Sequence, residues 1–177
     1  MADRNVVLTG FMGTGKTTVG RLVADRLGLE FVDTDAVIVE RHGPIPEIFT
    51  EHGEGAFRQM ERDVADELAD RSGLVIASGG RMLVDAVNAR RLAATGDVFC
   101  LVASVDTILE RVGGDGAAAV RPLLAGDDVP ARVGQLLSAR GDTYGRFRQV
   151  DTDRRTPDEV AAEIIELLDA GVERGDG

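Results

Sequence analysis

The stretch Gly10-Phe11-Met12-Gly13-Thr14-Gly15-Lys16-Thr17-Thr18 decides the fold of this 177-residue chain. It fits G-x-x-x-x-G-K-[ST], in which a glycine-rich turn offers backbone N–H groups to an anion and a lysine stands beside them. The apolar run 6–9 before it indicates a buried strand, and residues 18–27 after it have helical apolar spacing. A strand, a glycine loop and a helix in this order predict a phosphate-binding P-loop. The alternative is a chance match in a glycine-rich turn.

Lys16 is the only lysine among the 20 lysine and arginine residues of the chain. An ammonium is a compact point charge that can lie beside phosphate oxygens, whereas a planar guanidinium needs a wider slot. A chain that otherwise uses arginine for every cation therefore keeps lysine at the one position where the P-loop requires it.

Composition is that of a globular protein, with 44% hydrophobic and 29% charged residues. We expect one domain over residues 1–177, with a tail that frays from residue 171. No apolar run approaches the roughly 18 residues of a membrane span, and the first residues do not resemble a signal peptide. Cys100 lies in an apolar run, which predicts a core residue in a cytoplasmic protein without an internal disulfide.

The formal net charge of −11 argues against a nucleic-acid partner, because binding to a phosphate backbone needs a broad basic patch. It also means that the overall field repels an anionic ligand. Arginine and lysine side chains must therefore create a local positive cleft.

Strand and helix patterns alternate along the chain. This order predicts an α/β fold of three layers, with a five-stranded parallel sheet between helices. The expected strands are 6–9, 31–33, 74–77, 98–102 and 149–151, and the expected helices are 18–27, 35–41, 46–49, 56–68, 84–92, 105–112, 130–144 and 157–168. Ligands of such sheets bind at the carboxyl ends of the strands, so the P-loop, Asp33 with Asp35, and Ser78 with Gly79 and Gly80 should line one cleft.

Asp33 and Asp35 are predicted to point to the same side of an extended segment, because side chains alternate along a strand. One carboxylate would help to hold Mg²⁺ together with the hydroxyl of Thr17. The other would orient or deprotonate an acceptor hydroxyl. The alternative is that one of the two only caps the next helix.

Three arginines are candidates for binding anions. Arg58 shares a helix face with Glu61, which predicts either an ordinary surface ion pair or an anion clamp held by the glutamate. Arg121 follows a Gly/Ala-rich stretch, as in a closing lid at about 113–126 or in an incidental surface loop. Arg140 stands either on a solvated helix face or at the cleft.

Together these residues resemble the shikimate kinase family from Asn5 to about Leu168. The similarity is carried by the P-loop stretch 10–21, by Phe31-Val32-Asp33-Thr34-Asp35, by residues 47–61, by Arg121-Pro122-Leu123-Leu124, by Arg140-x-x-x-Tyr144, and by Val150-Asp151 with Pro157. The resemblance implies ATP and Mg²⁺ as cofactors and a small acidic polyol as the partner, bound in a region at about 34–62.

The resemblance also implies roles by position. Lys16, Asp35 and Arg121 would be catalytic. The nucleotide would contact Gly13, Thr14, Gly15, Lys16, Thr17, Thr18, Arg111 and Arg121; the metal would contact Thr17 and Asp33; and the acceptor would contact Asp35, Arg58, Gly79, Gly80 and Arg140. Arg111 would lie against the adenine, and Arg58 and Arg140 would clamp the carboxylate of the acid.

Two departures from the family pattern are expected near the acceptor. Arg81 stands where the family usually has a third glycine, and Arg146-Phe147-Arg148 is bulkier and more basic than usual. Arg81 either contacts the acceptor, obstructs the pocket or points to solvent at the rim, and we favour solvent.

The sequence therefore predicts a cytoplasmic, monomeric kinase that transfers a phosphoryl group from ATP to a hydroxyl of shikimate. The alternatives are a related kinase for another small hydroxy acid or polyol, and a nucleotide-binding regulatory protein without transfer activity.

Overall fold

A computed structural model describes residues 4–112 and 128–172 of the chain. Its centre is a parallel sheet of five strands in the order β2-β3-β1-β4-β5. The strands are β1 (Asn5–Gly10), β2 (Glu30–Asp33), β3 (Leu74–Ala77), β4 (Gly96–Val102) and β5 (Arg148–Asp151). The predicted α/β fold with a five-stranded parallel sheet is confirmed.

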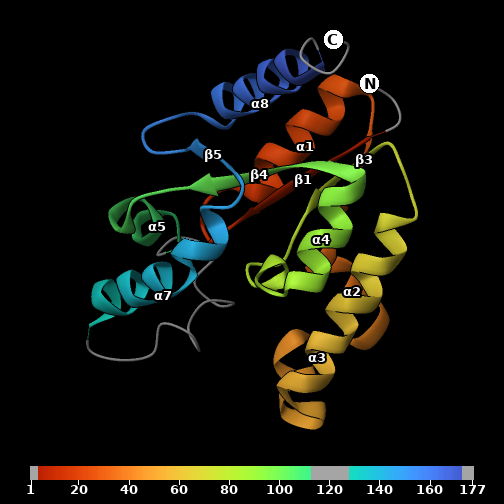
Figure 1. Ribbon diagram of the computed structural model, residues 1–177. Coiled ribbons are helices and arrows are strands. Elements are labelled where there is room, and N and C mark those ends of the chain that lie inside the picture. The colour runs from red at the N-terminus through yellow and green to blue at the C-terminus, as the bar shows by residue number, and fades with distance from the viewer. Residues whose placement is uncertain (1–3, 113–127, 173–177) are drawn as a thin grey trace.

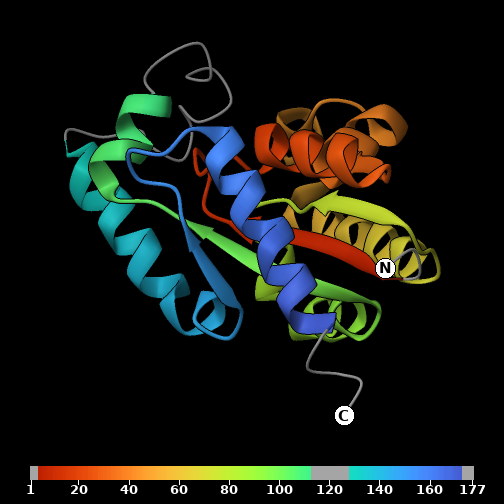
Figure 2. The ribbon, with the colours of Figure 1, turned by 90° about the horizontal axis from the view of Figure 1, so that it is seen from above.

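Helices cover both faces of the sheet (Figure 1). Helices α1 (Lys16–Leu27) and α8 (Pro157–Val172) pack together on one face, and α3 (Ile45–Ala69) and α4 (Ala86–Thr95) pack on the other. Figure 2 shows α8 lying across the sheet, with α5 (Val105–Val112) and α7 (Val129–Tyr144) grouped beyond the β4–β5 edge. The remaining helix, α2 (Thr34–His42), follows β2.

Strand β1 is buried over its whole length because it is central and covered on both faces. Val6 and Leu8 pack into the cluster beneath α1 and α8, whereas Val7 packs into the cluster beneath α3 and α4. This alternation is the two-residue period of a strand, and it explains why the strand reads as a continuous apolar run.

Several helix boundaries differ from the predicted ones. Helix α1 begins at Lys16, within the P-loop motif itself. The helix predicted over 84–92 is present as α4 but begins two residues later, at Ala86. A short 3₁₀ turn, η1 (Met82–Val84), precedes it, and Asp85 caps α4 because its Oδ1 accepts a hydrogen bond from the Val87 N–H. The two helices predicted on either side of residue 53 join as α3, which is kinked at Gly53 (φ 79°, ψ 171°).

Cys100 is a core residue, as predicted. Burial raises the pKa of its thiol to about 12, against a small opposing effect of Lys16, so the side chain stays neutral. In the part of the chain that the structure describes, every helix is too short or too polar to cross a membrane. Arg121 and the predicted lid lie outside the described residues, as do residues 173–177 of the predicted tail.

Candidate active site

The P-loop turns the chain from β1 into α1. Gly15 lies immediately before the first residue of α1, and its backbone is in the left-handed region (φ 94°). Residues other than glycine rarely adopt this conformation. The hydroxyl of Thr14 donates to the Phe11 carbonyl at 2.7 Å and closes the turn from inside. No acidic side chain stands in the first turn of α1, so the helix N-terminus presents its N–H groups to an anion without competition.

Lys16 folds its side chain back over the loop. Its Nζ donates to the carbonyls of Gly10 at 3.0 Å and Phe11 at 2.9 Å. Burial lowers the pKa of the ammonium to about 8, while the charges of Asp35 and Asp33 oppose that shift. Loop carbonyls and two nearby carboxylates therefore hold a desolvated cation at the head of the cleft.

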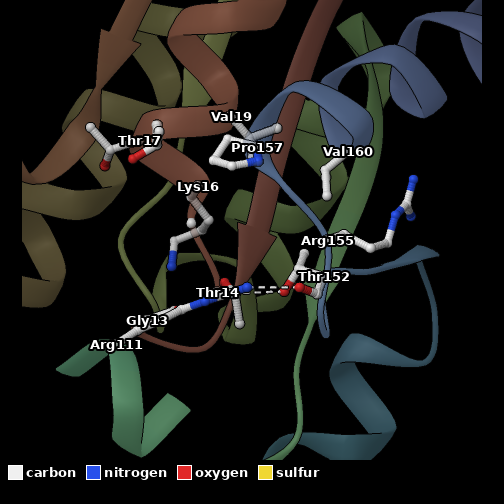
Figure 3. Close-up of a pocket in the computed structure, with 12 residues that line it drawn as sticks. Gly13, Thr14, Lys16, Thr17, Val19, Arg111, Thr152, Arg155, Pro157 and Val160 are labelled. Carbon is white, nitrogen blue, oxygen red and sulfur yellow. Dashed lines mark hydrogen bonds between the residues drawn. The ribbon is translucent and has the colours of Figure 1, made fainter. Parts of the chain in front are cut away.

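A cavity of about 490 Å³ opens beside the P-loop (Figure 3). Its walls come from the loop, from α5 and from the segment between β5 and α8. The lining residues are Gly13, Thr14, Gly15, Lys16, Thr17, Thr18, Val19, Arg111, Thr152, Arg155, Pro157 and Val160. All six residues predicted from the P-loop motif to contact the nucleotide, together with Arg111, line one cavity.

Arg111 ties two walls of this cavity together. Its guanidinium donates to the Gly13 carbonyl at 3.3 Å, and to the hydroxyl and carbonyl oxygens of Thr152 at 3.0 and 2.7 Å. Thr152 in turn donates to the Val102 carbonyl at 3.0 Å. The arginine thus fixes the P-loop against the end of the sheet while it lines the cavity.

Sequence reasoning missed Thr152 and Arg155, which line the same cavity. Arg155 is held by the carbonyls of Asp151 and Glu159 and by the carboxylate of Glu163. The signal was present in the sequence, since both residues follow the last strand, where a parallel sheet binds its ligands.

Asp33 has two partners, one for each carboxylate oxygen. Oδ1 accepts from the backbone N–H groups of Asp35 and Ala36 at 3.1 and 3.2 Å, which caps α2. Oδ2 accepts from the hydroxyl of Thr17 at 2.8 Å. Helix capping therefore does not exclude a metal role for Asp33, because the second oxygen of the same carboxylate still reaches the hydroxyl of Thr17.

Asp35 does not lie on an extended segment. Strand β2 ends at Asp33 and α2 begins at Thr34, so the prediction from side-chain alternation was wrong about the local conformation. The helix is favoured because the Asp33 cap satisfies its first N–H groups.

Asp35 is not among the residues that line the cavity beside the P-loop, but it lies close enough to Lys16 and Arg58 to interact with their charges. Burial and the charge of Asp33 raise the pKa of its carboxyl group, while Lys16 and Arg58 lower it. A methyl group added to Gly79 would lie 2.4 Å from Asp35 Oδ1, and the Gly79 N–H donates to the Thr34 hydroxyl at 2.8 Å. The end of β3 therefore packs directly on this carboxylate.

Arg58 is held by two glutamates. Its Nη1 donates to Glu61 at 2.6 Å, and its Nε and Nη2 donate to Glu54 at 3.2 and 3.0 Å. The predicted pair with Glu61 is confirmed, but it is not an ordinary surface pair, because Glu61 is buried. The link to Glu54 was missed.

Arg140 is buried, which excludes the alternative of a solvated helix face. Its guanidinium lies 5.0 Å from the centre of the Phe11 ring and donates to the Gly80 carbonyl at 3.2 Å. Tyr144, one turn later on α7, donates its hydroxyl to the same carbonyl at 2.7 Å. The Gly80 carbonyl thus joins α7 to the segment after β3, and Arg140 joins the same helix to the P-loop through Phe11.

The two departures from the family pattern lie in different places. Arg81 is half exposed and donates to Glu54 at 3.0 Å, so it is paired at the rim rather than pointing freely to solvent. The segment 146–148 leads into the amino end of β5, where Arg148 donates to the Leu167 carbonyl of α8. Ligands of a parallel sheet gather at the opposite, carboxyl edge, so this position gives no support to the expectation that the segment lies near the acceptor, which stays a prediction.

Comparison with known proteins gives one consistent result. A family model described as shikimate kinase matches residues 12–169. A shikimate kinase of Geobacter sulfurreducens is 44% identical over 93% of this chain and 91% of its own length, and one of Symbiobacterium thermophilum is 42% identical over 97% and 99%. A structure of the Acinetobacter baumannii shikimate kinase in complex with shikimate superimposes with a TM-score of 0.86 at 36% identity, covering 95% of this chain and 94% of that one.

Proposed function

The chain belongs to the shikimate kinase family, and we propose that it transfers the γ-phosphoryl group of ATP to a hydroxyl of shikimate. The observation that carries the proposal is the position of Asp35. A partly buried carboxylate with a raised pKa stands within the electrostatic reach of the P-loop lysine and of Arg58. An acceptor hydroxyl placed there would meet a phosphate donor and a proton acceptor together.

The nucleotide occupies the 490 Å³ cavity beside the P-loop in this proposal. The backbone of Gly13, Thr14 and Gly15 and the first turn of α1, with Thr17 and Thr18, bind the phosphates. Lys16 exchanges its two loop carbonyls for phosphate oxygens, and Arg121 adds a second positive charge. Arg111 lies against the adenine, held in place by its bonds to Gly13 and Thr152.

Thr17 and Asp33 are the residues that fit a magnesium ion. Their hydroxyl and carboxylate oxygens lie 2.8 Å apart, and both are hard oxygen ligands. Within residues 4–112 and 128–172, no group of three or more His, Cys, Asp or Glu side chains could hold a metal by itself. Magnesium usually takes one or two protein ligands and completes its shell with phosphate and water, and when bound it neutralises the charge that develops on the phosphates.

The acceptor lies on the Asp35 side of the cleft. Arg58 and Arg140 bind its carboxylate, and Gly79 and Gly80 line the floor between them. Asp35 accepts a hydrogen bond from the reacting hydroxyl and takes its proton as the oxygen attacks the γ-phosphorus and ADP leaves. A raised pKa suits this step, because a more basic carboxylate accepts the proton more readily.

A panel of acceptors tests the proposal. ADP release is measured with ATP and Mg²⁺ in the presence of shikimate, of other small hydroxy acids such as gluconate, and of no acceptor. We expect release that depends on shikimate, with the phosphorylated product identified by mass spectrometry. Stimulation by another acceptor alone would point to a related kinase, and nucleotide binding without release under any condition would point to a regulatory protein.

A monomeric state and a cytoplasmic location remain predictions. Size-exclusion chromatography with light scattering tests the first, and cell fractionation tests the second.

A further inference from the structure

Glu54 is the meeting point of two arginines from different parts of the fold. Its Oε1 accepts three hydrogen bonds, from Nε and Nη2 of Arg58 and from Nη1 of Arg81. Arg58 stands one turn further along α3, whereas Arg81 belongs to the segment between β3 and η1. A single carboxylate oxygen therefore connects the arginine proposed to bind the acceptor to a residue just after β3.

The backbone permits any residue at position 81. Its dihedral angles, φ −120° and ψ −3°, are ordinary for an L-amino acid, so glycine is not required there. The segment is anchored by hydrogen bonds from Met82 N to the Gly79 carbonyl and from Val84 N to the Arg81 carbonyl, each at 3.0 Å. The arginine side chain thus starts from a fixed turn, beside the glycines proposed to line the acceptor.

Glu54, by contrast, lies immediately after the kink of α3. Gly53 breaks the helix at this point with φ 79° and ψ 171°. A bond from Arg81 to Glu54 therefore ties the first residue after the kink to the end of β3.

The bond between Arg81 and Glu54 changes the balance of charge around Arg58. Arg58 alone faces two carboxylates, Glu54 and buried Glu61, so without another cation the group carries a net negative charge. Arg81 brings the four side chains to neutrality. Its charge acts on both glutamates, since it lowers the pKa of Glu54 in the same direction as Arg58 does and opposes the raised pKa that burial gives Glu61.

We propose that Arg81 is a positioning residue for the acceptor, which acts through Glu54 and not by direct contact. By sharing Glu54, it leaves more of the positive charge of Arg58 available to an acceptor carboxylate and holds that guanidinium at the mouth of the cleft. The inference rests on the proposed function, because it assumes an acidic acceptor. It makes the pair of residues 54 and 81 a determinant of acceptor affinity that is absent when position 81 is glycine.

The test is a double-mutant cycle of Arg81→Gln and Glu54→Ala, read by the Michaelis constants for shikimate and ATP. Both partners of the Arg81–Glu54 pair are about half exposed, and ion pairs so exposed to water are only weakly coupled. Arg81→Gln should therefore raise the shikimate constant about two- to fivefold, with kcat and the ATP constant unchanged. In the Glu54→Ala background the same change should have no effect. Arg81→Lys should restore the wild-type value, because the contact uses one nitrogen and one oxygen.

Arg62→Gln is the matched control. Arg62 is equally exposed, also joins α3 to the segment after η1, and pairs with Asp85, but it makes no contact with Glu54. This variant should leave the shikimate constant unchanged.

The outcomes are distinct. An equal rise in both backgrounds would mean that Arg81 touches the acceptor itself, and no rise in either would mean that it only fills space; each result overturns the proposal. Melting temperatures of all variants show whether a change reflects folding. If the wild-type protein releases no ADP with shikimate, the proposed function has failed before the cycle begins.

Discussion

The proposed nucleotide side of the site, which is the P-loop, and the proposed acceptor side, which comprises Asp35, Arg58, Gly79, Gly80 and Arg140, are built in different ways. On the nucleotide side, a contiguous loop folds on itself: Lys16 bonds to the carbonyls of Gly10 and Phe11, and Thr14 bonds to Phe11. On the acceptor side, side chains from α2, α3, α7 and the end of β3 meet through ion pairs and single close contacts. Arg58 is held by hydrogen bonds to Glu54 and Glu61. Arg140 is held by a hydrogen bond to the Gly80 carbonyl and by its contact with the Phe11 ring.

This difference separates the chemistry common to P-loop kinases from the choice of acceptor. Backbone N–H groups and a short-range turn bind phosphate with little dependence on the rest of the fold. The acceptor side depends on several elements that must dock correctly, so a small displacement of one changes the others. Substitutions there should affect acceptor affinity and turnover, and substitutions in the loop should affect nucleotide binding as well.

Asp35→Asn should give the largest effect and should separate the two sides most clearly. The amide cannot accept the hydroxyl proton, and general-base catalysis is worth about 10²- to 10⁴-fold in rate. We expect kcat to fall by that amount while ATP affinity, measured by calorimetry, changes less than about twofold. A loss of ATP affinity with little change in kcat would assign Asp35 to the nucleotide side instead.

Lys16→Arg should come next, with a loss of about 10²- to 10³-fold in kcat/KM for ATP, similar to the loss of one electrostatic donor in other enzymes. The charge is kept, but the planar guanidinium does not fit a position where Nζ lies 3.0 and 2.9 Å from two loop carbonyls. Thr18→Ser, which keeps a hydroxyl in the same loop, is the control and should stay close to wild type. Wild-type turnover in Lys16→Arg would show that charge alone suffices.

The fold could be predicted because its signals are local. Five short apolar runs alternate with helical patterns, and the eight-position P-loop motif fixes where the first strand ends and the first helix begins. Boundaries were less accurate where a cap or a 3₁₀ turn intervenes. The helix predicted from Val84 begins only at Ala86, because Val84 belongs to the 3₁₀ turn and the side chain of Asp85 caps α4.

The acceptor side could be predicted only in part. The Arg58–Glu61 pair follows from helical spacing, and the structure contains it. Two of the three hydrogen bonds to Glu54 come from Arg58, four positions along the same helix, so helical spacing could have indicated them as well. The bond from Arg81 to Glu54 and the contact of Gly79 with Asp35 join residues far apart in the sequence, and no local pattern encodes them. The prediction for Asp35 rested on side-chain alternation along a strand, whereas the structure positions this residue in the first turn of α2.

Gly79→Ala should have an intermediate effect on turnover, because it disturbs the acceptor side without removing a functional group. The added methyl group would lie 2.4 Å from Asp35 Oδ1, so the carboxylate or the end of β3 must move. A displacement of a catalytic group by about 1 Å can cost about 10²-fold in rate, and overpacking costs about 1–3 kcal/mol of stability. We expect kcat to fall about ten- to a hundredfold.

Gly134→Ala on α7 is the matched control for this substitution. A methyl group there meets no atom within 4 Å, and alanine favours the helix, so activity should be unchanged and the melting temperature equal or higher. If Gly79→Ala is as active as Gly134→Ala, the contact with Asp35 does not position the carboxylate.

The pH dependence of ATP binding should show the smallest effect and belongs to the nucleotide side alone. Burial lowers the pKa of Lys16 from 10.5 to about 8, so the free protein loses this cation as the pH rises through about 8. One unit above that value about a tenth of the ammonium remains, and ATP affinity should be up to about tenfold weaker. The stability of the free protein changes in the opposite direction, because the unfolded chain binds this proton more tightly than the folded one does. Burying the ammonium destabilises the fold fully below about pH 8, and this destabilisation disappears as the pH rises from about 8 towards 10.5. Calorimetric titration of ATP across this range measures the change, and Lys16→Arg should lack it, since a guanidinium stays protonated. An affinity that stays constant up to about pH 10 would mean that Asp35 and Asp33 outweigh burial and keep the ammonium charged.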